Sequence, residues 1–242
     1  RHYRFFNLIH KTLMKQYKLI ILFLFTILFV SCSSDDGKIS FTILQLNDVY
    51  EISSIQGGKY GGMARVETVH QELVAKNKNT LLVMAGDFLN PSLLGTMKHE
   101  GVRVRGKQMI EVMNAMSFDL VAFGNHEFDI PKKDLQKRMD ESNFPWISSN
   151  VFNKTADSIK QFYQELSGVK RLIKGSFIKE IFDEDGTKIK VGFISVCIPS
   201  NPKDYVLYKD MFSAIVKEYE SIKNKVDIVI GLTHVKIEHD RE

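Results

Sequence analysis

The stretch DLVAFGNHEFD, residues 119–129, joins a short apolar run to a cluster of polar side chains. The run DLVA has the composition of a buried strand, and the Asn, His, Glu and Asp of the remainder come where that strand should end. Amide, imidazole and carboxylate groups bind metal ions, and the last two also transfer protons. The stretch therefore predicts a buried strand whose carboxyl end carries a functional site.

Three other apolar runs end in a similar way. The runs that finish LND, AGD and LTH place Asp48, Asp87 and His234 directly after predicted strands. Taken alone, each aspartate is equally well explained as a helix cap or turn former, and a lone histidine is more often packed or solvated. Ligands of open α/β sheets bind at the carboxyl ends of strands. Because four strand ends carry oxygen and imidazole donors, the sequence favours a metal site.

Helical patterns alternate with these strands. Apolar residues recur at helical spacing over residues 63–76 and 106–116, and a third pattern begins at Pro131 and runs to about Glu141. A fourth covers residues 210–223. Strands that alternate with helices predict an α/β fold with a largely parallel sheet.

Three segments complete the predicted domain. PWISSNV, residues 145–151, has the pattern of a short strand, whereas residues 153–168 are polar, weakly patterned and predicted to form a loop. The run FIKEIFDEDGTKIKVGFISV, residues 177–196, predicts two strands around the turn at residues 183–186. This hairpin adds an antiparallel element to the fold.

The first 31 residues have the composition of an export signal. They contain five basic and no acidic residues and lead into an apolar run of twelve, residues 19–30. That run is too short to span a bilayer but fits the apolar region of a signal peptide behind the basic MKQYK. Residues 1–31 are therefore predicted to be an export signal, with Met14 as the true start.

Cys32 follows the apolar run after one small residue and precedes a polar, acidic stretch. This order resembles the lipobox of bacterial lipoproteins, although Phe29 stands where Leu is more usual. The resemblance implies a lipid on Cys32, a polar tether over residues 32–38 and a membrane-anchored protein that faces the periplasm or the cell surface. The alternative is an ordinary cleaved signal with a chance cysteine.

The charge of the chain changes once the signal is set aside. Five of the 33 basic residues lie in residues 1–31, so the remainder carries 28 basic and 29 acidic groups, a formal charge of −1. The basic excess belongs to the export signal, and we expect no nucleic-acid binding. Cys197, in the apolar run VGFISVC, is predicted to be a buried small hydrophobe without a disulfide partner.

Taken in chain order, LND, GDFLN, GNHEFD and GLTH resemble the calcineurin-like metallophosphoesterase superfamily, and within it the bacterial 5'-nucleotidase and sugar-nucleotide hydrolase family. RGKQMIEVMNAMSFDLVAFGNHEFD is also similar to that family, so the likeness runs from about Phe41 to the end of the chain. The resemblance implies the metallophosphoesterase fold, an α/β sandwich of two sheets flanked by helices, over residues 39–242. The family pattern continues past GLTH to a Gly-His-x-His stretch and a nucleoside-binding C-terminal domain. We therefore expect the fold to be incomplete at the C-terminus.

The resemblance also implies two divalent metal ions bridged by one carboxylate. That role falls on Asp87, with Asp48 on the first metal and Asn125 and His234 on the second. Carboxylate, amide and imidazole donors suit Zn, Mn, Fe or Co. Two such ions would hold phosphate oxygens and lower the pKa of a bound water, so that the hydroxide left after it loses a proton attacks phosphorus without a covalent enzyme intermediate.

His126 and Asp129 are implied to form a catalytic dyad. The imidazole stabilises the transition state or protonates the departing oxygen, and Asp129 orients the ring and raises its pKa. Glu127 is predicted to be structural, with Phe128 packed beneath the loop. The family usually has Asp-x-His at the first strand end, where this chain has Tyr50. Because a neutral phenol is a poor ligand, the first metal either loses an imidazole or finds another donor. A further alternative is that Tyr50 hydrogen-bonds a metal-bound water.

The leading hypothesis is an exported, lipid-anchored hydrolase of phosphate esters, with nucleotides as substrates. One alternative is a lipoprotein that keeps the fold for binding, with a metal site weakened by Tyr50. Another is an enzyme of the same superfamily, either a cyclic-nucleotide diesterase or a sugar-nucleotide hydrolase. Metal content separates the binding hypothesis from the enzymatic ones.

Overall fold

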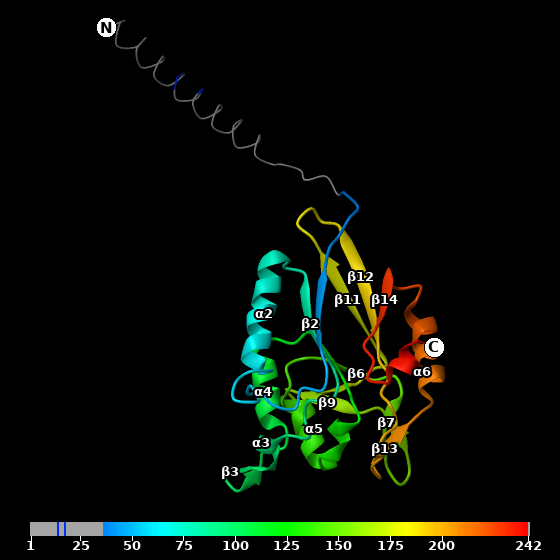
Figure 1. Cartoon of the computed structure of the whole chain (residues 1–242). Helices are drawn as coiled ribbons and strands as arrows, with labels where there is room; N and C mark the ends of the chain where they lie inside the picture. The colour runs from blue at the N-terminus through cyan, green and yellow to red at the C-terminus, as the bar shows by residue number, and fades with distance from the viewer. Residues whose placement is uncertain (1–13, 15–16, 18–35, 242) are drawn as a thin grey trace, which may run out of the picture. The chain divides into compact units, whose positions relative to one another are not determined.

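A computed structural model describes Met14, Tyr17 and residues 36–241 (Figure 1). Cys32 and, apart from Met14 and Tyr17, the predicted export signal of residues 1–31 lie outside the described residues, so the signal and the lipid anchor stay predictions. Over the part of the chain that is described, none of the helices combines the length and apolar character that a membrane crossing needs.

The chain divides into two units, Arg1–Lys38 with Glu184–Thr187, and Ile39–Asp183 with Lys188–Glu242. In the first unit, the backbone N–H of Asp36 donates to Asp185 Oδ2 at 3.1 Å. The second unit contains the helices and strands described below.

The first sheet has four parallel strands, in the order β1 (Thr42–Leu46), β2 (Thr80–Ala85), β5 (Leu120–Ala122) and β6 (Trp146–Ile147). The side chains of β2 are buried on both faces because alternate residues of the strand pack into two hydrophobic clusters, one on each face of the sheet. β1 is an edge strand whose residues are half-buried, with Gln45 exposed. The parallel sheet predicted from the sequence is present.

The second sheet has the order β11 (Ser176–Phe182), β12 (Lys188–Ile194) and β14 (Ile228–Gly231). β11 and β12 form the predicted antiparallel hairpin, and β14 runs parallel to β12. The two sheets face one another across a hydrophobic cluster whose buried members are Leu81, Val83, Ala85, Leu120, Ala122, Ile147, Ile181, Val191, Phe193 and Leu232. The fold is therefore the predicted two-sheet sandwich.

Helices cover the outer faces of the sandwich (Figure 1). α2 (Met63–Lys76), α4 (Lys107–Ala115) and α5 (Lys132–Glu141) contribute apolar residues to a cluster that also takes in alternate residues of β2. On the second sheet, α6 (Met211–Ile222) packs against β12. All four helices lie within about one residue of their predicted bounds.

The prediction of one strand over residues 145–151 was wrong. β6 ends at Ile147, and the separate strand β7 (Val151–Lys154) pairs with β13 (Val206–Tyr208) in another sheet. Between them, Asn150 is fully buried, donating from Nδ2 to the Cys197 carbonyl at 2.8 Å and accepting from its N–H at 3.0 Å. This side chain therefore bonds a neighbouring segment while the backbone turns.

The prediction of a loop over residues 153–168 was also wrong. This region contains β8 (Ile159–Lys160) and β9 (Tyr163–Leu166), and β9 forms an antiparallel hairpin with β10 (Val169–Leu172). The connecting residues Ser167 and Gly168 both have positive φ, as a two-residue hairpin turn of type I′ requires. Short elements that the sequence did not predict are α3 (Leu93–Thr96), β3 (Lys98–His99), β4 (Val102–Arg103) and α7 (Ile237–Asp240).

Candidate metal centre and active site

Asp48 and Asp87 lie two residues beyond the ends of β1 and β2, where the chain leaves the first sheet. Both have positive φ, 55° and 58°, a region that aspartate tolerates better than most residues. Gly124 follows β5, and a Cβ atom there would overlap the Asp87 carboxylate. The glycine therefore lets the loops after β2 and β5 meet at this edge.

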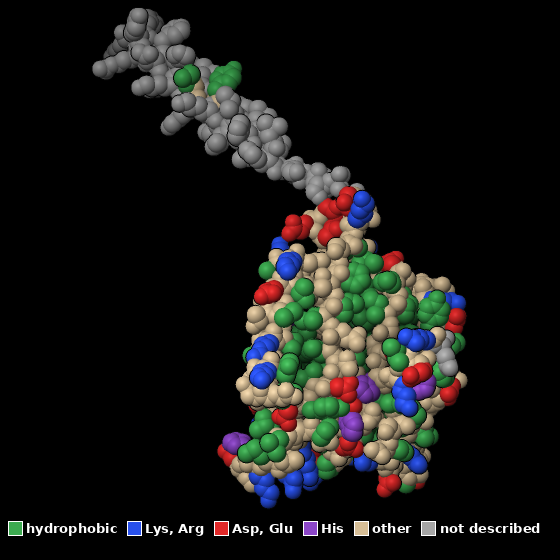
Figure 2. All heavy atoms as spheres, in the orientation of Figure 1, with side chains coloured by type: hydrophobic (Ala, Val, Ile, Leu, Met, Phe, Trp, Pro, Cys, Tyr) green, Lys and Arg blue, Asp and Glu red, His purple; other side chains and the backbone are tan. Residues whose placement is uncertain are grey.

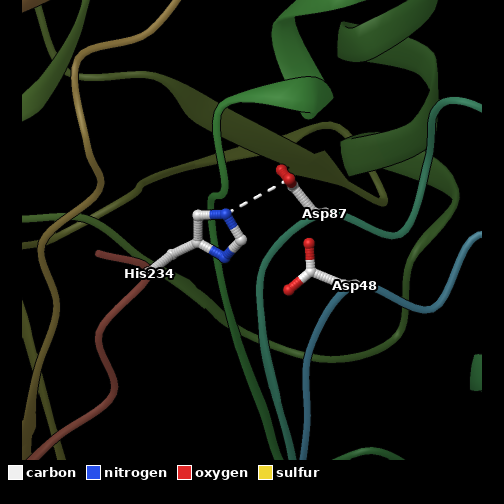
Figure 3. Close-up of side chains that lie close together, drawn as sticks. All are labelled: Asp48, Asp87 and His234. Atoms are coloured by element: carbon white, nitrogen blue, oxygen red, sulfur yellow. Dashed lines mark ion pairs between the residues drawn. The ribbon is translucent and has the colours of Figure 1, made fainter. Parts of the chain in front are cut away.

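His234 reaches the same point from the second sheet. Beyond β14 its backbone N–H donates to the Val196 carbonyl at 2.8 Å, which continues the pairing with the segment after β12. Ring Nδ1 lies 2.7 Å from the Ala85 carbonyl, which can only accept, so Nδ1 carries the proton. Nε2 then faces the Asp87 carboxylate at 3.2 Å (Figure 3).

The ligand atoms of Asp48, Asp87 and His234 all lie within 4.8 Å of one another (Figure 3). Burial alone would lower the pKa of the His234 ring, but the hydrogen bond and charge of Asp87 outweigh burial and raise it to about 9. The surroundings therefore favour a positive charge here. Two carboxylates and an imidazole held through its other nitrogen are a donor set that fits a divalent transition-metal ion.

Asn125 lies at the start of the 3-10 helix η1 (His126–Asp129). Its neighbour His126 donates its backbone N–H to Asp87 Oδ1 at 2.8 Å, which fixes this turn beside the candidate metal centre. The Asn125 side chain does not cap the helix, although asparagine often does so at this position. Its amide oxygen is therefore not used for capping.

Tyr50 bonds the two carboxylates directly. Its hydroxyl donates to Asp48 Oδ1 at 2.9 Å and lies 3.2 Å from Asp87 Oδ2. Burial and the hydrogen bond to Asp48 raise the pKa of the phenol further above its usual range, so Tyr50 is a neutral donor. The Tyr50 hydroxyl therefore contacts both of the carboxylates that were predicted to bind metal.

His126 and Asp129 form the predicted pair. His126 Nδ1 donates to Asp129 Oδ2 at 2.6 Å, because a 3-10 turn aligns side chains three residues apart. Burial opposes charge on the ring, but Asp129 and then Asp87 outweigh burial and raise the pKa of His126. Burial would also raise the pKa of Asp129, yet His126 and Lys203 hold it below its usual value. The pair can therefore hold a proton beside the candidate metal centre.

Glu127, predicted to be structural, has a specific structural role. The residue is fully buried, and its Oε2 accepts from the N–H groups of Gly124 at 2.7 Å and Asp87 at 2.8 Å. Its Oε1 accepts from Phe88 at 2.8 Å and Leu89 at 3.1 Å. Four backbone donors from two loops therefore converge on one carboxylate, which shapes the turn that carries Asp87.

A sequence profile described as calcineurin-like phosphoesterase matches residues 41–241. The chain belongs to the calcineurin-like phosphoesterase family. Members of this family use divalent metal ions, which agrees with the donor set formed by Asp48, Asp87 and His234.

Within the calcineurin-like phosphoesterases, this chain is similar to 5'-nucleotidases. It is 30% identical to the snake venom 5'-nucleotidase of Crotalus adamanteus over 225 residues, which cover 85% of this chain and 34% of that protein. It is also 30% identical to 5'-nucleotidase of Homo sapiens, over 85% of this chain and 35% of that protein. The chain thus spans about a third of the length of these curated relatives.

Solved structures show the same fold. The 5'-nucleotidase precursor from Thermus thermophilus superposes with a TM-score of 0.64 at 23% identity, over 83% of this chain and 38% of that one. The calcineurin-like phosphoesterase YfkN from Bacillus subtilis gives a TM-score of 0.61 at 24% identity, over 81% and 62%. The two-sheet sandwich is therefore the fold of this family.

Proposed function

We propose that the intact protein is a metal-dependent hydrolase of phosphate esters, with nucleotides as its substrates. The observation that carries the proposal is the convergence of Asp48, Asp87 and His234 beside the pair formed by His126 and Asp129. The likeness to 5'-nucleotidases supports the choice of nucleotide. Residues 39–242 would supply the catalytic domain.

In this proposal Asp87 would hold both of two ions, with Asp48 on the first and Asn125 and His234 on the second. Bound divalent ions, whether Zn, Mn, Fe or Co, would supply Lewis acidity and an activated water for attack on phosphorus. His126 presents its Nε2 side to the centre and donates a proton to the leaving oxygen. Asp129 holds Nδ1–H and keeps the ring in that orientation.

A metal-depletion assay tests the function. The intact protein is expected to hydrolyse AMP, to lose activity after chelation and to regain it when one of these four metals is added back.

Asp87→Asn should lower bound metal at both sites, whereas Asn125→Ala should mainly affect one. Asp134→Asn is a matched control, because Asp134 is also a buried aspartate but pairs with Arg105 instead. Equal metal loss in the Asp87 and Asn125 variants would contradict the assignment.

A binding role without catalysis is the second candidate, and Tyr50 is the observation that favours it. Its hydroxyl contacts a carboxylate oxygen of both Asp48 and Asp87 and therefore competes with the first metal ion for these oxygens. Metal-loaded protein that binds AMP but leaves it intact would support this role. Preferential turnover of a cyclic nucleotide or a nucleotide sugar would instead replace the substrate while keeping the chemistry.

The location of the protein is a separate proposal. We infer from the sequence that residues 1–31 direct export and that a lipid on Cys32 anchors the protein to a bacterial membrane, behind the tether of residues 32–38. The catalytic domain would then face the periplasm or the cell surface. Nucleotides outside the cytoplasm would be its substrates.

The anchor is tested by Cys32→Ser. In a bacterial host the wild-type protein should fractionate with membranes and incorporate labelled fatty acid. The variant should carry no label and should either be released or keep its signal. Ser33→Ala is the matched control and should behave as the wild type. A soluble, unlabelled wild-type protein with a different N-terminus would refute the anchor.

A further inference from the structure

Asp129 has different partners on its two carboxylate oxygens. Oδ2 accepts the hydrogen bond from His126 Nδ1 and lies 3.4 Å from Asn90 Nδ2. Oδ1 forms an ion pair with Lys203 Nζ at 3.2 Å. Lys203 comes from the loop between β12 and β13, so a distant segment contacts the oxygen that His126 leaves free.

The same loop also holds the backbone around Asp129. The Tyr205 hydroxyl lies 3.1 Å from the Phe128 carbonyl and 3.0 Å from the Ile130 carbonyl, and donates its proton between them. The Tyr205 ring packs edge-on against that of Phe128. The carbonyls on either side of Asp129 are thus bonded by a residue two positions beyond Lys203.

Lys203 is itself well placed to keep this geometry. Its carbonyl accepts from the Val206 N–H at 2.9 Å, which closes a turn at the start of β13. Val206 then pairs with Asn153 on β7. The lysine backbone is therefore fixed to a sheet, and only its side chain needs to extend to Asp129.

We propose that Lys203 is a positioning residue that acts through Asp129. A carboxylate bonded through one oxygen can still rotate about its last side-chain torsion, because that torsion has a broad energy minimum. An ammonium group on the second oxygen removes that freedom, so Asp129 presents Oδ2 to His126 in one orientation. The inference rests on the proposed proton donation by His126.

The exposure of this ion pair indicates whether its loss would change the stability of the fold or the activity. The Lys203 side chain is 41% exposed, and exposed ion pairs contribute little to folding stability. Replacement of Lys203 should therefore leave the fold intact and change the activity. The pair Lys179 and Asp119 is a close match, with the same 3.2 Å separation and a lysine that is 40% exposed. Its lysine lies on β11, and its aspartate precedes β5, whereas His126 follows the other end of that strand.

Lys203→Met in the intact, metal-loaded protein is expected to lower kcat on AMP about tenfold, as removal of an orienting partner commonly does. KM and metal content should be unchanged, and Lys203→Arg should recover most of the rate. Lys179→Met should have no effect. A raised KM with an unchanged kcat would overturn the inference, because it would mean that Lys203 contacts the substrate instead.

A double variant tests the route of the effect. If Lys203 acts through Asp129, then Lys203→Met should cause no further loss in an Asp129→Asn protein. Equal losses in both backgrounds would refute positioning.

A crystal structure of Lys203→Met provides a readout that is independent of activity. We expect a rotated Asp129 carboxylate, and an unchanged one would overturn the inference. A wild-type protein that does not hydrolyse AMP would refute the proposed function separately.

Discussion

Glu127→Gln is expected to lower the free energy of unfolding by about 4 kcal/mol, although the two side chains have the same shape. Glu127 offers two acceptor oxygens to four buried N–H donors. Glutamine has only one oxygen, and its NH₂ group would face two of those donors instead of accepting from them. Each buried donor left without an acceptor costs roughly 1 to 3 kcal/mol, which accounts for the size of the effect.

Chemical denaturation measures this loss, and metal titration measures its consequence for the site. Because Glu127 fixes the N–H of Asp87, the variant should also bind metal more weakly. Glu180→Gln is the control, since Glu180 forms an exposed pair with Lys190, and its stability change should stay within about 0.5 kcal/mol. Wild-type stability in Glu127→Gln would mean that the four hydrogen bonds are not holding the loops together.

His126→Ala should lower kcat on AMP by about 10² to 10⁴, the range usual for a lost acid or base group, while metal content is retained. The ring is placed to donate a proton and is not among the groups whose ligand atoms cluster at the centre. The loss should be smaller for p-nitrophenyl phosphate, because its acidic leaving group needs little protonation. Asp129→Asn should follow the same pattern more mildly, since it acts only on the ring.

Steady-state rates on both esters and metal analysis of the same samples test this division of roles. His99→Ala, an exposed histidine on β3, is the control and should leave both quantities unchanged. Loss of metal in His126→Ala would make His126 a ligand, and AMP turnover at the wild-type rate would remove it from the mechanism.

The sequence predicted the central elements because their patterns are strong. β2 is buried on both faces, and its sequence is an almost unbroken apolar run. The turn residues at 183–186 predict the hairpin of β11 and β12. The hairpin of β9 and β10 was missed because the residues of β10 are exposed and show no alternation. The break after β6 was missed because the serines and asparagine that bend the chain there are buried and bonded to backbone.

The candidate site also has parts that the sequence predicts and parts that it does not. Asp48 and Asp87 follow neighbouring parallel strands, so their meeting could be predicted from the order of the sheet. The geometry of Tyr50 could not, because the sequence does not fix which acceptor a phenol reaches. Lys203 gave no signal, since it lies in a loop without periodicity and meets Asp129 only through the tertiary fold.

The contact between His234 and the Ala85 carbonyl joins residues 149 positions apart. Closing so long a stretch of chain carries a large entropic penalty, and contacts of this kind tend to form late in folding. During synthesis the first sheet can pair as soon as β6 has emerged, but the imidazole arrives only after β14. We therefore expect His234 to join the two aspartates only after the first sheet has formed, and a nascent chain that lacks β14 would hold Asp48 and Asp87 without the imidazole of the candidate metal centre.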